Sequence, residues 1–164
     1  ELTVTEMVTG VDLVKAQVKV AFGQDLPFEQ ADIKLLGTAI ECRINAEDPA
    51  KNFTPSVGKV DYLYFPVGNL GMRIDSDLYA GAKISPYYDS MIAKVIVLGE
   101  NRHEAIEKLK RLLSEMVISG IKTNQNFYLT ILEDQGFLDA TFNTDYLDRF
   151  LLPEWKRGNA DETV

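Results

Sequence analysis

The sequence predicts an α+β fold, an antiparallel sheet flanked by helices, from three observations. Apolar residues alternate with polar ones between residues 38 and 45, which is the period of a half-buried strand. Residues 91–98 form an almost continuous apolar run, as expected for a central strand that is covered on both faces. After residue 101 the apolar residues recur at intervals of three and four, the spacing of amphipathic helices.

The chain is expected to begin with one helix and a connector. The helix is predicted from about Val11 to Phe22, with Thr9 as its N-cap and Gly23 as its stop. Residues 24–36 lack a regular apolar period and are interpreted as the connector. The sheet should therefore start after this segment.

Strands are predicted at residues 38–45, 59–65, 72–75 and 91–98, with a short further strand at 82–84. In the second strand, Val60, Tyr62 and Tyr64 should share one face, because alternate residues of a strand point the same way. Residues 46–58 contain turn signals and are expected to form a loop. Lys94 interrupts the last apolar run, so it is expected at a strand end or sheet edge, where its long side chain reaches water.

The second half of the chain is expected to be helical. Helices are predicted over residues 102–118, 124–133 and about 144–151, with Asn101, Asn124 and Thr144 as N-caps. Gly120 is expected to end the first of these helices. Residues 152–164 are interpreted as a loose tail, because they are mostly polar and terminal.

Composition argues against several classes of function. The net charge of −8 disfavours a nucleic-acid partner. Cys42 is the single cysteine and His103 the single histidine, so neither a disulfide nor a zinc cluster is expected, and no metal site is predicted. No apolar run reaches the ~18 residues of a membrane span, so no membrane partner is expected. A buried thiol in a reducing, cytoplasmic compartment is the simplest interpretation of Cys42.

Arg73 is the strongest candidate for a functional residue. It lies in the predicted strand at 72–75, and its forked, permanently charged donors match the oxygens of anions and carboxylates. The alternative is structural: Arg73 would pair with Asp75 or Asp77 on a solvated sheet face. The glycines at 68–71 suit a hairpin better than a phosphate loop. The residue pattern alone thus defines an acidic α+β domain.

Four ordered segments resemble the carboxyl-terminal region of biotin carboxylase, which carboxylates biotin with ATP and bicarbonate. They are VTEMVTGVDL at 4–13, ECRINAEDP at 41–49, PYYDSMIAK at 86–94 and GIKTN at 120–124. The loop at 53–59 is also similar to the family, and the resemblance extends to about residue 151. Tyr87, Tyr88 and Asp89 belong to the third segment and are assigned to turn structure. The order and intervals of the set make the resemblance specific.

The resemblance implies that this chain is the last third of an ATP-grasp ligase. Residues 1–36 would be the tail of the ATP-grasp domain with a connector, residues 37–151 the C-terminal domain and residues 152–164 the loose tail. ATP, Mg²⁺ and biotin would be the cofactors of the intact subunit. Because the nucleotide and metal machinery of the family lies upstream, the isolated fragment is expected to bind none of them and to be inactive.

The resemblance also implies two catalytic residues. Arg73 matches the family's active-site arginine, which binds bicarbonate and the enolate form of biotin, and a fixed guanidinium would stabilise the charge on the ureido oxygen. Glu1 falls where the family's Glu-His-x-Val-Thr-Glu run has its general base, although Leu2 replaces the usual histidine. Ser119 is a second departure, because some members carry there an acidic residue linked to the biotin pocket.

The partners implied by the resemblance are the biotin carboxyl carrier protein, the upstream ATP-grasp domain and a second copy in a homodimer. The end of the chain, about forty residues after Asn124, fits the biotin carboxylase subunit of a bacterial-type acetyl-CoA carboxylase, which serves fatty acid synthesis. Pyruvate carboxylase and the larger acyl-CoA carboxylases contain the same region and are alternatives. A further alternative is that the isolated piece is a non-catalytic structural and dimerisation module.

Overall fold

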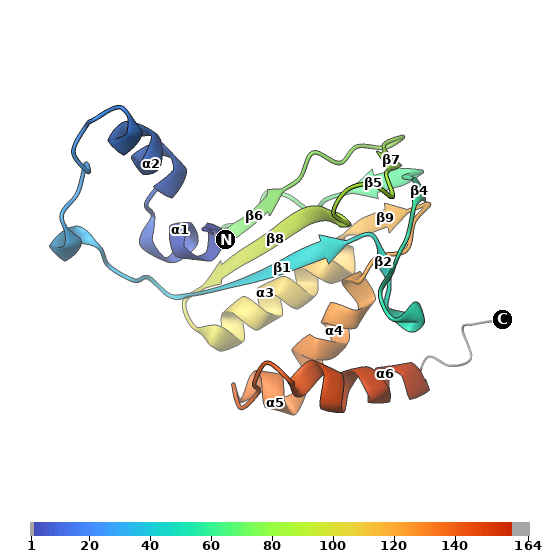
Figure 1. The fold of residues 1–164 in the computed structure, drawn as a ribbon. Coiled ribbons are helices and arrows are strands. Elements are labelled where there is room, and N and C mark those ends of the chain that lie inside the picture. The colour runs from blue at the N-terminus through green and yellow to red at the C-terminus, as the bar shows by residue number, and fades with distance from the viewer. Residues whose placement is uncertain (1, 159–164) are drawn as a thin grey trace.

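In the computed structural model, which describes residues 2–158, a three-stranded antiparallel sheet is flanked by helices (Figure 1). The sheet contains, in spatial order, β1 (Thr38–Asn45), β8 (Met91–Gly99) and β6 (Met72–Asp75). The shorter antiparallel pairs are β2 (Glu47–Asp48) with β3 (Thr54–Pro55), β4 (Gly58–Lys59) with β7 (Lys83–Ile84), and β5 (Tyr62–Tyr64) with β9 (Val117–Ser119). The predicted α+β class with an antiparallel sheet is confirmed.

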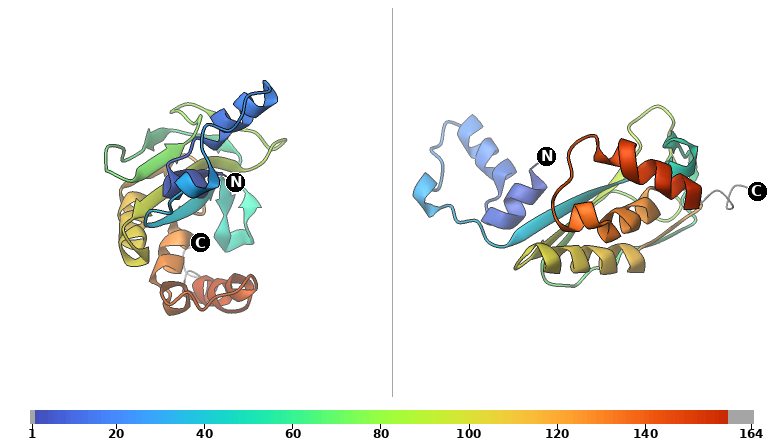
Figure 2. Two further views of the ribbon diagram at one scale, coloured as in Figure 1. Left: turned by 90° about the vertical axis from the view of Figure 1, so that its left-hand side faces the viewer. Right: turned by 90° about the horizontal axis from the view of Figure 1, so that it is seen from below.

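The helices lie at two places around the sheet. They are α1 (Thr3–Thr9), α2 (Leu13–Ala21), α3 (Arg102–Glu115), α4 (Gln125–Glu133), α5 (Gln135–Leu138) and α6 (Leu152–Gly158), with a π-helical turn at Leu147–Leu151 and 3-10 turns at Gln30–Asp32 and Pro49–Lys51. Figures 1 and 2 show α3 and α4 beneath the sheet, α5 and α6 below them, and α1 and α2 at the end where β1 begins.

The main core lies between the sheet and α3. It contains Cys42 and Ile44 of β1, Val95 and Val97 of β8, and Ile106, Leu109, Leu112 and Leu113 of α3, all buried. Burial of these apolar side chains supplies the main driving force for placing α3 on this face. Burial also raises the pKa of the Cys42 thiol to about 12, so the predicted inert, buried cysteine is confirmed.

Two predictions about the strands are wrong. Lys94 does not lie at an edge: it occupies the central strand β8, in register with Arg43 on one side and Asp75 on the other. Its side chain avoids burial because it lies on the sheet face opposite α3 and remains partly exposed. The segment at 59–65 is not a strand of the main sheet, because only Tyr62–Tyr64 is extended and it pairs with β9.

The environments of Val60, Tyr62 and Tyr64 also differ from the prediction. Val60 is fully buried, whereas Tyr62 and Tyr64 are 56% and 48% exposed. Val60 instead lies in the short connection between β4 and β5, where its N–H donates to the carbonyl of Ala82. The regular alternation across Val60 therefore does not correspond to one continuous strand.

Gly120 has a different role from the predicted helix stop. Helix α3 already ends at Glu115, and Gly120 follows the short strand β9 instead. Its φ of +92° favours glycine, and a Cβ at this position would lie 2.2 Å from the carbonyl oxygen of Lys59. The glycine therefore allows two chain segments to approach each other closely.

The helix caps are partly as predicted. Asn101 accepts a hydrogen bond from the N–H of Glu104 at 3.0 Å, which confirms it as the N-cap of α3. Thr9 is not the cap of the first predicted helix, because it ends α1, a helix that was not predicted. Asp12 caps α2 instead, by accepting from the N–H of Lys15 at 2.8 Å.

Asn124 precedes α4, but its side chain binds β1 rather than capping the helix. The Asn124 Oδ1 accepts from the N–H of Asn45 at 3.0 Å, and its Nδ2 donates to the carbonyl of Arg43 at 3.1 Å. The hydroxyl of Tyr128 donates to the same carbonyl at 3.0 Å. Asn124 is only 6% exposed, so these bonds fasten the start of α4 to the sheet in a buried setting.

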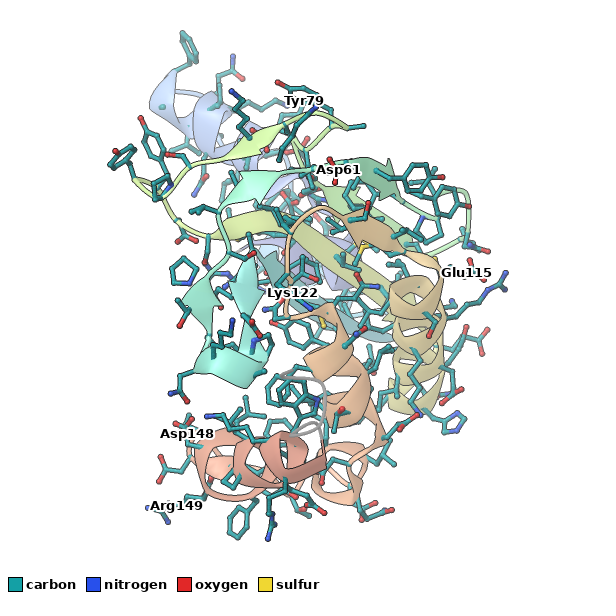
Figure 3. All side chains as sticks on the ribbon, turned by 90° about the vertical axis from the view of Figure 1, so that its right-hand side faces the viewer. Asp61, Tyr79, Glu115, Lys122, Asp148 and Arg149 are labelled. Carbon is teal, nitrogen blue, oxygen red and sulfur yellow. The ribbon has the colours of Figure 1, made fainter. Side chains whose placement is uncertain are left out.

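The predicted loose tail is wrong for residues 152–158, which form α6. The indole ring of Trp155 packs edge-on against Phe127 of α4, with ring centroids 5.5 Å apart. The helical segment begins at Leu147, so Thr144 is not its cap. Asp148 and Arg149, labelled in Figure 3, lie on its exposed side. Residues 159–164 of the predicted tail lie outside the described residues.

We expect Asn124→Ala to lower the free energy of unfolding by about 2 kcal/mol, because it leaves the partly buried N–H of Asn45 without its acceptor. The matched control is Asn101→Ala, which removes a solvent-exposed cap and should cost about 1 kcal/mol. Urea denaturation of the three proteins measures both values. Equal losses in the two variants would contradict a special role for Asn124.

Candidate active site on the outer face of the sheet

The face of the sheet opposite α3, called here the outer face, carries a cluster of charged side chains. It contains Glu41 and Arg43 of β1, Arg73 and Asp75 of β6, and Lys94 of β8. The cause is strand alternation, because the pattern that directs Cys42 and Val95 toward α3 directs their neighbours outward. The same register places Glu41, Ile96 and Arg73 in one row, and Arg43, Lys94 and Asp75 in the next.

Helix α1 lies on part of this face. Thr3 donates a hydrogen bond from its hydroxyl to the carboxylate of Glu41, and Glu6 accepts one from Arg73. Ile96, in the row between these two contacts, is fully buried. The β-branched Thr3, Val4 and Thr5 are poor helix formers, so sequence propensity could not reveal α1. Contacts with the sheet hold it in place instead.

Arg73 is held by two carboxylates. Its Nε donates to Asp75 Oδ1 at 2.8 Å and its Nη2 to Asp75 Oδ2 at 2.6 Å, which is a bidentate ion pair. Its Nη1 donates to Glu6 Oε2 at 2.6 Å. The predicted pairing with Asp75 is therefore confirmed, whereas Asp77 makes no ion pair within residues 2–158. The Arg73 side chain is 35% exposed, so it remains accessible.

The ion pairs shift the pKa values of Arg73 and Glu6 in opposite directions. The hydrogen bonds to Asp75 and then Glu6 raise the pKa of Arg73 above its ordinary value. The hydrogen bond from Arg73 is the largest cause that lowers the pKa of Glu6. The other oxygen of Glu6 accepts from the N–H of Leu13 at 3.1 Å, at the start of α2. Glu6 thus links α1, α2 and the sheet.

A hollow of about 390 Å³ opens beside Arg73. It is lined by Glu6, Gly10, Val11, Asp12, Val14 and Arg73. Arg73 is the only cationic residue in this lining, which also contains the carboxylates of Glu6 and Asp12. Asp12 also caps α2, so one of its oxygens is already bonded. The hollow therefore offers a guanidinium to a small polar group but no net positive charge.

The other residues singled out in the sequence lie elsewhere. Glu1 is outside the described residues, and its position relative to Arg73 stays a prediction. Tyr87 and Tyr88 are 89% and 84% exposed in the turn before β8, in agreement with a turn role. Asp89 accepts from the N–H of Met91 at 2.8 Å in the same turn. Ser119 pairs with Tyr62 in β5–β9 and does not line the hollow.

Within residues 2–158, no three or more histidine, cysteine, aspartate or glutamate side chains gather as a metal-binding group. None of the helices in the same range has the length and apolar content needed to cross a membrane. His103 is exposed on α3.

Known families match most of the chain. Residues 41–149 match the biotin carboxylase C-terminal domain, and residues 1–29 match the ATP-binding domain of the carbamoyl-phosphate synthase L chain. The chain is 55% identical over 150 residues to Biotin carboxylase 1 of Bacillus subtilis, covering 92% of this chain and 33% of the relative. It is 45% identical over 148 residues to the 2-oxoglutarate carboxylase small subunit of Hydrogenobacter thermophilus, covering 90% and 31%.

Solved structures agree with these matches. The biotin carboxylase subunit of pyruvate carboxylase superposes with a TM-score of 0.90 at 43% identity, over 95% of this chain and 34% of that structure. The biotin carboxylase domain dimer of Hydrogenobacter thermophilus 2-oxoglutarate carboxylase, in complex with MgADP, ADP and bicarbonate, gives 0.88 at 44% identity, over 90% and 32%. The chain spans about a third of the length of the curated relatives it matches.

The fold and these matches define a class of protein, the carboxylases that contain a biotin carboxylase domain or subunit. The chain belongs to the biotin carboxylase family, and residues 41–149 match its C-terminal domain. The resemblance read from the four sequence segments is thereby confirmed. The match of residues 1–29 to an ATP-binding domain agrees with a short ATP-grasp tail before it. The domain boundaries at residues 36 and 151 stay predictions.

The Glu6–Arg73 contact should make the stability of the chain depend on pH. Since the folded pKa of Glu6 is lowered from 4.5, its contribution is present above that value and is lost as the pH falls through the folded value. Glu6→Gln lacks the contribution at every pH. The difference between the urea midpoints of the two proteins should therefore be largest near neutral pH and shrink as the pH falls below 4.5, the ordinary pKa of a glutamate. A constant difference would contradict this account of Glu6.

Proposed function

We propose that this chain is the C-terminal part of an enzyme that carboxylates carrier-bound biotin with ATP and bicarbonate. The observation that carries the proposal is the guanidinium of Arg73, held by Asp75 and Glu6 at the wall of the hollow. Family membership supports the reaction, and the structure of a relative in complex with MgADP and bicarbonate supports its substrates and metal. ATP, Mg²⁺ and biotin would act in the intact subunit.

In this proposal Arg73 stabilises negative charge on substrate oxygens. Removal of a proton from a ureido nitrogen of biotin places charge on the ureido oxygen, and a fixed guanidinium nearby stabilises that charge as it develops. The ion pairs of Arg73 orient the group before the reaction, so no energy is lost on orienting it during the reaction. Glu1 is proposed as the general base on the basis of its motif position alone.

The finer assignment concerns the complete enzyme. We propose the biotin carboxylase subunit of a cytoplasmic acetyl-CoA carboxylase that serves fatty acid synthesis, with the carrier protein and a second copy of the subunit as partners. Relatives named as parts of pyruvate and 2-oxoglutarate carboxylases are similarly close, so those enzymes are equal alternatives. The dimeric relative supports the second copy. The compound that the complete enzyme carboxylates, an acyl-CoA thioester or a 2-oxo acid, would decide between them.

A second candidate function is that the isolated chain is a non-catalytic structural module. The charge of the Arg73 site favours this for the piece alone, because two carboxylates already neutralise the guanidinium. An anion such as bicarbonate would meet no net positive charge in the hollow. The cations that attract it would have to come from the part of the relatives that this chain does not match.

We expect Arg73→Lys in the full-length enzyme to lower biotin-dependent ATP cleavage by about 10²–10³-fold, because lysine keeps the charge but loses the fork. The unfolding midpoint should change little, since partly exposed ion pairs contribute little to stability. Arg43→Lys is the matched control, because Arg43 lies on the same sheet face but does not line the hollow, and it should retain activity. A large drop in melting temperature with normal turnover would assign Arg73 to structure.

The isolated chain should not hydrolyse ATP when it is incubated with Mg²⁺, bicarbonate and free biotin. The reason is that the described residues contain no metal-binding group and the hollow contains a single cation. Release of ADP is measured against a preparation carrying Arg73→Ala. Biotin-dependent ADP release by the unmodified chain alone would show that the piece is itself catalytic.

A further inference from the structure

The carboxylate of Asp75 determines how the guanidinium of Arg73 is oriented. Both of its oxygens are used on one edge of the guanidinium, with Oδ1 bound to Nε at 2.8 Å and Oδ2 bound to Nη2 at 2.6 Å. Two parallel bonds between planar groups fix the plane as well as the position of the guanidinium. A single hydrogen bond, such as the one that Nη1 donates to Glu6, cannot fix the plane of the guanidinium alone.

Asp75 is itself attached to a rigid part of the fold. It is the last residue of β6 and is paired in register with Lys94 of the central strand. Directly after it, the hydroxyl of Ser76 donates to the carbonyl of Ile92 at 2.6 Å and accepts from the N–H of Leu78 at 3.0 Å. The backbone on both sides of Asp75 is therefore fastened to the sheet.

The remaining donors of Arg73 follow from this arrangement. A guanidinium has five N–H groups, and three of those on Arg73 bind Asp75 and Glu6. One N–H on each terminal nitrogen is left for another acceptor. Because Asp75 occupies the Nε edge, the terminal nitrogens form the end that can meet a ligand in the hollow.

We propose that Asp75 is a positioning residue for the reaction: it holds Arg73 so that both terminal nitrogens present an N–H to a substrate oxygen. This inference rests on the proposed function. Asp75 acts through Arg73 and makes no contact with substrate itself. Outer-shell partners that orient metal-binding side chains contribute about 10–100-fold to activity, and we expect an effect of this size for Asp75.

The test uses the full-length enzyme with Asp75→Asn, which is isosteric but lacks the charge and places an amide against the guanidinium. We expect kcat/KM for biotin to fall by about 10–100-fold, while KM for ATP stays nearly unchanged. Asp75→Glu keeps a carboxylate and should recover part of the loss. Asp77→Asn is the control, because this exposed carboxylate is on the same segment and makes no ion pair with Arg73 within the described residues.

A double-mutant cycle separates positioning from general structure. In an Arg73→Ala background, adding Asp75→Asn should cause no further loss of activity, because Asp75 has no other route to the substrate. An additive loss, or an Asp75→Asn enzyme with normal kcat/KM for biotin, would overturn the proposal. Thermal unfolding of each variant confirms that folded enzyme is compared, and Asp75→Glu supplies the comparison if Asp75→Asn unfolds.

The outcome for the unmodified enzyme separates the two proposals. Biotin-dependent ATP cleavage by that enzyme, together with unaffected Asp75 variants, would leave the proposed function intact and remove only the role of Asp75. Absence of biotin-dependent ATP cleavage in a folded, unmodified enzyme would remove the proposed function, and the role of Asp75 with it.

Discussion

The pairing of β8 with strands on both sides is the constraint on which the rest of the structure depends. Its register with β1 and β6 decides which residues of all three strands face α3 and which face outward. A shift of one residue would exchange the two sets, bringing Arg73 and Lys94 into the apolar core. The cost of burying such charges excludes that register. The core and the candidate site are therefore two consequences of the same pairing.

Much of the fold could be predicted because its strongest signals are local. The alternation at 38–45 and the apolar run at 91–98 both correspond to strands of the sheet. The sequence does not predict the two helices whose tertiary contacts outweigh local preference. Helix α1 is formed by poor helix formers that contact the sheet. Helix α6 is held by the packing of Trp155 against Phe127. A polar, terminal segment gave no sign of that packing.

The candidate site shows a similar division. The sequence indicated Arg73 and named Asp75 as its structural partner, because residues two apart in a strand share a face. Glu6 was missed, since 67 residues separate it from Arg73 and only the fold brings them together. From the sequence, the functional and structural interpretations of Arg73 are alternatives. The geometry makes them compatible, because an ion pair that fixes an arginine also leaves donors available on its far side.

Asn124 has a consequence for association between molecules. Strand β1 lies at the border of the sheet, so its outward N–H and C=O groups are a potential template for a strand from another chain. Asn124 accepts a hydrogen bond from the N–H of Asn45, and both Asn124 and Tyr128 donate to the carbonyl of Arg43. These bonds remove part of that template. A side-chain amide thus substitutes for a missing neighbour strand. In a crowded cell, this protection would disfavour aggregation through the open border of β1.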